Sequence, residues 1–243
     1  LVTSATDGYS TVNSNFIIIA PLSITQQPAV EQTVCEDSTV SVSVSLNTLE
    51  SAPVDTYLWQ SSFDGTTWSN IIDNVVYNGA TSAVLEINNI PLSFNNISFR
   101  AVIDRQGNGC GVISESSTIF IDALPTITIP TALEECDNDY DGIDIFDLSQ
   151  KTEELLGGQL NVSVSYYESQ VDANAATNAI VDLYENTTAD SQNVFVRLED
   201  DLTFCYATTT LELIVNPIPE VIIPPIVEVC DDDYDGISTF DLV

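Results

Sequence analysis

The sequence predicts an all-β protein built from tandem two-sheet sandwich domains, with a short helix in the second domain. Three observations predict it. Short segments alternate apolar with polar residues, β-branched and aromatic residues supply much of the 44% hydrophobic content, and one segment recurs 94 residues later in the chain. The longest apolar run, residues 16–22, falls well short of the roughly 20 residues that span a bilayer.

Residues 21–123 are expected to form the first sandwich domain. Residues 40–46 alternate Val or Leu with Ser, which is the period-two pattern of a half-buried strand. Turn signals such as Asp64-Gly65 separate short strands along the rest of the domain, and this spacing favours two packed sheets. The further strands are expected at residues 57–60, 83–87, 98–103 and 117–121.

Residues 124–217 are expected to form a second β-rich domain, sandwich-like and more acidic than the first. Its alternating segments are residues 160–167, 194–198 and 210–215. One helix is predicted over 148–156, because Asp147 or Ser149 can cap its start and Gly157-Gly158 can end it.

An internal repeat defines the domain boundaries. Residues 124–148 and 218–242 align without a gap, and 14 of the 25 positions are identical. Residues 218–243 are therefore interpreted as the start of a second copy, and the natural protein is expected to continue beyond Val243. Residues 1–20 are interpreted as the final strand or strands of a preceding domain. The joints are short and contain Pro, so the domains are expected to form a semi-rigid rod.

The charge restricts the possible functions. The chain has 37 Asp and Glu residues, 4 Lys and Arg residues and no His, giving a formal charge of −33. The absence of His excludes Ser-His-Asp and Cys-His catalysis, and no pair of acids is singled out for hydrolysis, so the chain is not expected to be an enzyme. Phosphate would be repelled, which excludes nucleic acid as a partner. The charge favours a cation, above all Ca²⁺.

Five cysteines point to a disulfide framework. Each full domain contains two, so we predict the intradomain pairs Cys35–Cys110 and Cys136–Cys205, with the partner of Cys230 beyond residue 243. Each pair would close a loop of about 70 residues, worth roughly 4 kcal/mol in the chain-entropy model. The alternative is buried free thiols, as in a cytosolic protein; disulfides would place the chain outside the cytoplasm.

Two acidic segments carry the pattern D-x-D-x-D-G. We call them the first acidic loop (residues 137–143) and the second acidic loop (residues 231–237). Alternate carboxylates on a tight turn converge on one point, and the Gly permits the turn, which is the design of a calcium loop. The predicted ligands are Asp137, Asp139, Asp141, the Ile143 carbonyl and Asp147 in the first loop region, and Asp231, Asp233, Asp235, the Ile237 carbonyl and Asp241 in the second.

The match to an EF-hand is partial. An EF-hand places a bidentate Glu at the twelfth position, where this chain has Leu148 and Leu242. The segments instead resemble the calcium loops of dockerins and thrombospondin type 3 repeats. The alternative is a metal-free turn rich in Asp and Asn.

Other candidate sites are weaker. Trp59, Trp68 and Tyr57 could form a sugar-stacking patch, but a sandwich-core role for Trp59 is favoured, and Trp68 is the better candidate for an exposed ring. Triplets beginning at Asn96, Asn161 and Asn186 match the N-glycosylation pattern, which is common by chance.

The second domain resembles a repeat of giant cell-surface and gliding-motility adhesins of Bacteroidetes, of the SprB type. The resemblance rests on Cys136-Asp137-Asn138-Asp139-Tyr140-Asp141-Gly142, Phe146-Asp147-Leu148-Ser149, Ser165-Tyr166-Tyr167-Glu168, Val194-Phe195-Val196-Arg197 and Cys205-Tyr206-Ala207-Thr208. The first domain resembles their Ig-like modules, through Val34-Cys35-Glu36-Asp37-Ser38, Tyr57-Leu58-Trp59-Gln60, Asp64-Gly65 and Cys110.

The resemblance implies tandem Ig-like domains in the stalk of a secreted adhesin, exported by the type IX secretion system and attached to the outer membrane. The expected partners are neighbouring repeats, the secretion and attachment machinery, and a surface polysaccharide or other extracellular ligand. The alternative function is a calcium-dependent carbohydrate-binding accessory module of a secreted enzyme.

Overall fold

The computed structural model describes residues 22–47, 55–105, 111–181, 183–219, 222–223 and 225–240. The expected strand at the end of the preceding domain, in residues 1–20, lies outside these ranges, as do Cys110 and Asp241. The chain divides into two compact units. The first holds the N-terminal domain to Thr126 together with Glu199–Ala207, and the second holds the rest.

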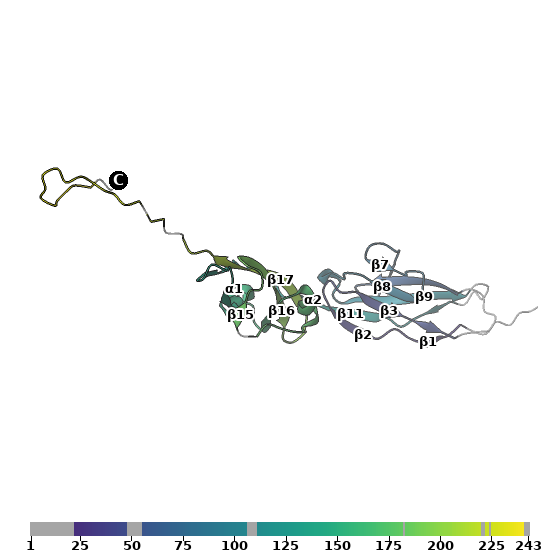
Figure 1. Cartoon of the computed structure of the whole chain (residues 1–243). Coiled ribbons are helices and arrows are strands. Elements are labelled where there is room, and N and C mark those ends of the chain that lie inside the picture. The colour runs from purple at the N-terminus through teal and green to yellow at the C-terminus, as the bar shows by residue number, and fades with distance from the viewer. Residues whose placement is uncertain are drawn as a thin grey trace, which may run out of the picture. The chain divides into compact units, whose positions relative to one another are not determined.

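The first domain is an Ig-like sandwich (Figure 1). One sheet has the order β2-β11-β9-β5-β6, with β10 also paired to β9, and the opposing strands form the sheet β3-β8-β7 and the pair β1-β4. The elements are β1 (Ile24–Gln26), β2 (Glu31–Cys35), β3 (Val40–Ser43), β4 (Ser45–Leu46), β5 (Asp55–Ser62), β6 (Ser69–Asn70), β7 (Tyr77–Asn78), β8 (Val84–Ile87), η1 (Leu92–Phe94), β9 (Ile97–Arg105), β10 (Val112–Ile113) and β11 (Ser117–Asp122).

The alternation in residues 40–46 has the predicted consequence. Val40, Val42 and Val44 are buried, whereas the Ser residues between them are exposed. The segment forms two strands rather than one, because β3 pairs with β8 while β4 pairs with β1 in a separate sheet. Trp59 is fully buried between the sheets, and its indole N–H donates to the Ser82 carbonyl at 2.8 Å.

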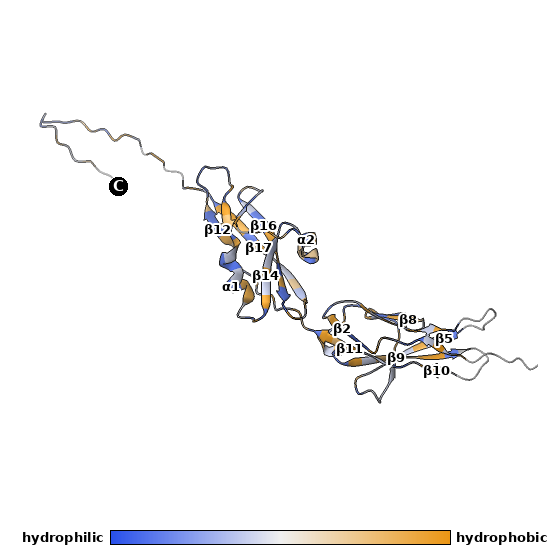
Figure 2. Cartoon of the chain, turned by 90° about the horizontal axis from the view of Figure 1, so that it is seen from below, coloured by the Kyte–Doolittle hydropathy of each residue, from blue (hydrophilic) through white to orange (hydrophobic). Residues whose placement is uncertain are grey.

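The second domain has a four-stranded sheet of order β12-β17-β16-β14, a strand pair β13-β15 and short helices. Its elements are β12 (Leu133–Cys136), β13 (Ile145–Asp147), η2 (Leu148–Lys151), α1 (Thr152–Leu156), β14 (Val162–Tyr167), α2 (Gln170–Ala175), β15 (Leu183–Glu185), β16 (Ser191–Asp200) and β17 (Tyr206–Asn216). Figure 2 shows hydrophobic residues gathered on strands such as β17, where Leu211, Leu213 and Val215 are buried in the core.

The predicted helix over 148–156 is confirmed as η2 followed by α1. Asp147 caps it by accepting from the Ser149 N–H, and Gly157 ends it in the left-handed conformation at φ 55°. A second helix, α2, was not predicted. Ser169 caps it by accepting from the Asp172 N–H, and the Ser-x-x-Asp spacing was the available signal.

The predicted disulfide pairing is wrong. The structure joins Cys35 at the end of β2 to Cys205 in the hairpin between β16 and β17, with a Cα–Cα distance of 5.5 Å and a sequence separation of 170. Neither Cys35–Cys110 nor Cys136–Cys205 forms, and Cys136 and Cys230 are exposed free thiols. The prediction assumed that each domain closes on itself, but the 199–207 hairpin belongs by its contacts to the first compact unit.

Among the described residues, no helix is long and apolar enough to cross a membrane. The one disulfide that the described residues contain indicates an extracytoplasmic location, because such bonds persist in oxidising compartments.

Candidate metal centre

The first acidic loop is the turn between β12 and β13. The chain leaves β12 at Cys136 and reverses through two left-handed residues, Tyr140 at φ 70° and Gly142 at φ 74°. This reversal brings one carboxylate oxygen each from Asp137, Asp139 and Asp141 within 4.8 Å of one another. Since Ca²⁺ binds oxygens at about 2.3–2.6 Å, two ligands on opposite sides of an ion lie about 5 Å apart, so the spacing fits one shared cation.

Asp137 organises the loop from its first position. It is buried, and its carboxylate accepts from the backbone N–H groups of Asp139 at 3.1 Å, Tyr140 at 2.7 Å and Gly142 at 3.1 Å. Burial is the largest single influence on its pKa and raises it, but the backbone hydrogen bonds together outweigh burial and leave the pKa below its usual value. Asp137 is therefore held as a charged carboxylate.

The charge on Asp139 is less favourable. The Asp141 carboxylate raises the pKa of Asp139, with smaller contributions from desolvation and from Asp137. Asp139 and Asp141 are both exposed, so both are accessible to an ion from solvent. A divalent cation would remove the repulsion that raises this pKa, and this relief favours metal binding.

The second acidic loop repeats these contacts without a sheet around it. The Gly236 N–H donates to Asp231 at 2.8 Å, and the Ile237 N–H donates to Asp235 at 2.8 Å, as Gly142 and Ile143 do in the first loop. The oxygens of Asp231, Asp233 and Asp235 also lie within 4.8 Å of one another. No strand is assigned in residues 225–240, so the short sequence itself favours this conformation.

Asp231 carries an additional sign of a cation site. Its Oδ1 atom is buried and has no hydrogen-bond partner among the described residues. The Gly236 N–H is the main cause of its lowered pKa, so the carboxylate is charged. A buried charged oxygen without a donor fits a metal ligand.

Not every predicted ligand joins these clusters. Asp147 instead accepts from the N–H of Ser149 at 3.1 Å and from its hydroxyl at 2.6 Å, and it caps η2. It is not one of the acids that converge in the first acidic loop. Asp241 lies outside the described residues. Ile143 and Ile237 donate their backbone N–H groups within the loops, and ligation by their carbonyl oxygens stays a prediction.

Asn186 anchors the first acidic loop and was missed as a structural residue. It is buried, its side-chain amide donates to the carbonyls of Gly142 at 2.9 Å and Thr188 at 2.8 Å, and its Oδ1 accepts from the Asp144 N–H at 2.7 Å. This amide is engaged inside the domain and is not available to a sugar. Only the Asn-Thr-Thr triplet marked the position in the sequence.

Gly142 fits closely against the same segment. The Asp190 N–H donates to the Gly142 carbonyl at 3.0 Å. A Cβ atom on Gly142 would lie 2.8 Å from Oδ1 of Asp190 and 2.9 Å from the Ala189 Cβ. The loop is therefore fixed in place by both its left-handed glycine and the neighbouring chain.

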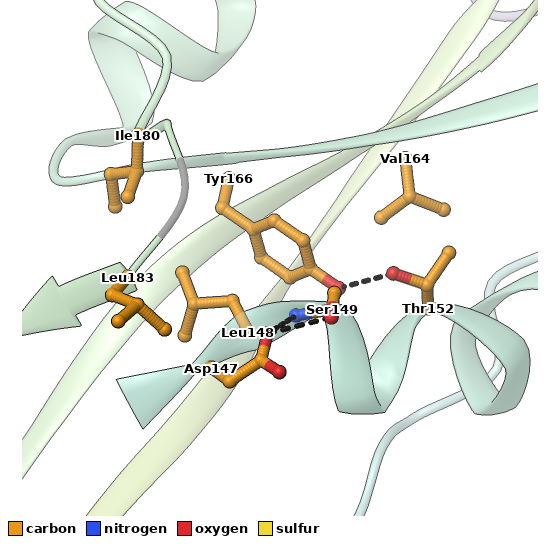
Figure 3. Close-up of a pocket in the computed structure, with 8 residues that line it drawn as sticks. All are labelled: Asp147, Leu148, Ser149, Thr152, Val164, Tyr166, Ile180 and Leu183. Carbon is orange, nitrogen blue, oxygen red and sulfur yellow. Dashed lines mark hydrogen bonds between the residues drawn. The ribbon is translucent and has the colours of Figure 1, made fainter. Parts of the chain in front are cut away.

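The second domain also contains an open pocket of about 490 Å³ (Figure 3). The lining residues are Asp147, Leu148, Ser149, Thr152, Val164, Tyr166, Ile180 and Leu183. The Tyr166 hydroxyl lies 3.2 Å from the Thr152 hydroxyl. The Asp147 carboxylate accepts a hydrogen bond from the Ser149 hydroxyl. These polar side chains of the lining are therefore hydrogen-bonded to one another in two pairs.

The two tryptophans do not form an open sugar-stacking platform. Trp59 lies in the core, as favoured from the sequence. Trp68 is only partly exposed, and the Arg100 guanidinium lies over its ring, 4.1 Å from the centroid. This cation–π contact covers one ring face.

Two protein-family models match separate parts of the chain. Residues 132–219 match the Flavobacterium inter-domain disulphide bond domain, and residues 25–123 match a domain of unknown function, DUF8696. The Flavobacterium match indicates an origin among the Bacteroidetes. The Cys35–Cys205 disulfide joins the two matched regions, because Cys35 lies in residues 25–123 and Cys205 lies in residues 132–219.

Similar solved structures include the N-terminal Ig1-2 module of the Drosophila receptor protein tyrosine phosphatase DLAR. It is 14% identical, with a TM-score of 0.33, and the match covers 81% of this chain and 100% of that one. The BTLA ectodomain (15% identity, TM-score 0.32) and murine CRIg (11% identity, TM-score 0.33) each match over 42% of this chain and over 100% and 99% of their own. No curated protein matches the chain.

Proposed function

We propose that this chain is a repeat region from the stalk of a large extracellular adhesin of Bacteroidetes, joined between domains by disulfides and stiffened by calcium. The observation that carries the proposal is the Cys35–Cys205 bond, which links two sequence domains across 170 residues. A bond between domains restrains bending at the joint, whereas the predicted intradomain bonds would have stabilised each domain separately.

Calcium at the acidic loops is the second part of the proposal. Each loop begins one residue after an exposed cysteine, Cys136 or Cys230, and follows a Pro-containing joint. An ion bound by three carboxylates would neutralise charge where the chain is most acidic and restrict the loop. Support comes from the converging oxygens in both loops and from the buried unpaired oxygen of Asp231.

The proposal assigns no catalytic activity to the chain and places it on the cell surface, attached to the outer membrane after export by the type IX secretion system. It also includes a role in surface attachment or gliding motility. These finer assignments follow from the sequence resemblance. An origin among the Bacteroidetes and an extracytoplasmic location support them.

Small-angle scattering on the full chain tests the stalk role. We expect the narrowest distribution of molecular dimensions in oxidising buffer with calcium, a broader one with chelator, and the broadest with reductant and chelator together. The Cys136→Ser variant is the matched control, because that thiol is already free and the substitution should leave every profile unchanged. Identical profiles under all conditions would contradict the proposal. Selective binding on a glycan array would favour the carbohydrate-binding alternative.

A further inference from the structure

The pocket of the second domain opens beside an exposed leucine and a carboxylate. Strands β13 and β15 are antiparallel, with Phe146 opposite Tyr184 and Asp147 opposite Leu183. Phe146 and Tyr184 are buried in the core. Successive residues of a strand point to opposite faces, so Asp147 and Leu183 lie together on the outward face. Leu183 lines the pocket and is still 61% exposed, which leaves an apolar wall open to solvent next to an acid.

The same combination recurs one pair further along these strands. Ile145 lies opposite Glu185, and both side chains are exposed, Ile145 by 52%. We call Ile145, Asp147, Leu183 and Glu185 the outer face of β13–β15. It therefore carries two aliphatic and two acidic side chains at the mouth of the pocket. Apolar groups gathered in this way and edged by polar ones are typical of an interaction site.

Inside the pocket, the polar groups are already hydrogen-bonded and the remaining walls are apolar (Figure 3). The apolar walls are Leu148, Val164, Ile180 and Leu183. The Thr152 and Tyr166 hydroxyls pair with each other, and Oδ1 of Asp147 accepts from both the N–H and the hydroxyl of Ser149. An apolar side chain could thus enter without breaking these bonds. The volume of about 490 Å³ lies within the usual range for ligand pockets.

The charge around the pocket favours a cation. Oδ2 of Asp147 has no hydrogen-bond partner among the described residues. Residues 124–217 contain 18 acidic and 2 basic residues, and both basic side chains are engaged elsewhere. Lys151 pairs with Glu154 at 3.2 Å, whereas Arg197 is buried and donates to backbone carbonyls of α2. A basic ligand would therefore meet uncompensated carboxylates at the outer face.

We infer that the pocket and the outer face of β13–β15 bind an extended segment of a partner protein, in which an apolar residue has Lys or Arg two positions away. The apolar side chain fills the pocket. The basic residues, which point the same way in an extended segment, lay their aliphatic stems along Leu183 and Ile145 and bring their charges to Asp147 and Glu185. A sugar would find the hydroxyls of the pocket already paired, and an anionic lipid surface would be repelled. The inference does not depend on the adhesin role, on calcium or on the disulfide.

A short peptide of this pattern is the probe. The acetylated and amidated peptide Lys-Gly-Leu-Gly-Lys is titrated into the full chain, and the methyl signals of Ile, Leu and Val are followed by NMR. We expect saturable shifts of the signals from Leu148, Val164, Ile180 and Leu183. The matched peptides Glu-Gly-Leu-Gly-Glu and Lys-Gly-Ser-Gly-Lys should each bind at least roughly tenfold more weakly.

Two variants test the two halves of the site. Leu183→Ser removes the exposed wall and should weaken binding of the Lys-Gly-Leu-Gly-Lys peptide by about fivefold or more. Asp147→Asn removes the charge, keeps an oxygen for Ser149 and should weaken binding about two- to fivefold. If Asp147→Asn lowers the melting temperature, Glu185→Gln on the exposed neighbouring strand serves as the charge test, with the same expected loss.

Two control variants lie outside the site in the same domain. Glu212 is an exposed acid that accepts from the Ser191 hydroxyl, and Leu160 is 84% exposed. Glu212→Gln and Leu160→Ser should bind the peptide as the unmodified chain does. Equal losses in the test and control variants, or shifts confined to the acidic loops, would mean general charge attraction and overturn the inference. Equal binding of either matched peptide, or no shift up to the solubility limit, also overturns it.

Discussion

Replacing Asn186 tests whether the second domain depends on its anchor for the first acidic loop. Asn186→Ala removes three hydrogen bonds, to the Gly142 and Thr188 carbonyls and from the Asp144 N–H, at a buried position. The Gly142 carbonyl keeps its bond from the Asp190 N–H, so it is not left unpaired. At roughly 1 kcal/mol for each hydrogen bond lost, with more for an orphaned buried donor, the expected cost is about 3 kcal/mol.

A loss of this size corresponds to a fall of roughly 10–20 °C in the melting temperature of a domain of this length. The two tryptophans, Trp59 and Trp68, both belong to the first domain, so their fluorescence reports that domain alone. Circular dichroism reports both domains. The variant should therefore shift a transition seen by circular dichroism and leave the fluorescence transition in place.

Asn138→Ala is the matched control within the same loop. Asn138 is exposed, and its amide makes one long contact of 3.5 Å with Asp144. Its replacement should cost no more than about 0.5 kcal/mol, as is usual for surface positions. If Asn186→Ala proves no more destabilising than Asn138→Ala, the anchor role assigned to Asn186 is refuted.

Three further predictions follow from the disulfide, the charges and the glycines. Cys35→Ser should lower the free energy of unfolding by up to about 5 kcal/mol, the chain-entropy value for a 170-residue loop; denaturant titration checks this, and an effect no larger than that of Cys136→Ser would contradict it. In chelator, Asp139→Asn should raise the melting temperature, and this gain should shrink as pH falls. The pKa of Asp139 is raised in the folded chain, so its ionised form opposes folding, and protonating the wild-type carboxyl removes that effect. In calcium the same variant should bind roughly tenfold more weakly by calorimetry, and unchanged binding would exclude Asp139 as a ligand. Gly142→Ala should lower the free energy of unfolding by about 2–4 kcal/mol, because a Cβ atom would meet Asp190 and Ala189. Gly158 is also left-handed but has open space around it, so Gly158→Ala should lower this free energy by only about 1 kcal/mol. Equal shifts of the melting temperature in the two variants would show that the neighbouring segment does not constrain the loop.

Local features of the sequence determined the secondary structure and the shape of the acidic loops. Alternation placed Val40, Val42 and Val44 inside, and an Asp cap and a Gly stop bounded the helix at 148–156. The conformation of the acidic loops could be predicted because the hydrogen bonds that the two loops share connect residues no more than five positions apart, as the matching contacts of Asp137 with Gly142 and of Asp231 with Gly236 show. These contacts form at both places where the short sequence occurs in this chain.

The tertiary structure decided which distant groups meet. Cys35 and Cys205 are 170 positions apart, and the count of two cysteines per domain could not reveal that the 199–207 hairpin packs with the first unit. Asn186 reaches Gly142 across 44 positions, and only the packed domain turns a glycosylation-like triplet into an anchor. Sequence spacing encodes bonds along the chain, but a disulfide or a buried amide requires two segments to approach in space, and that approach is set by the pairing and packing of the strands.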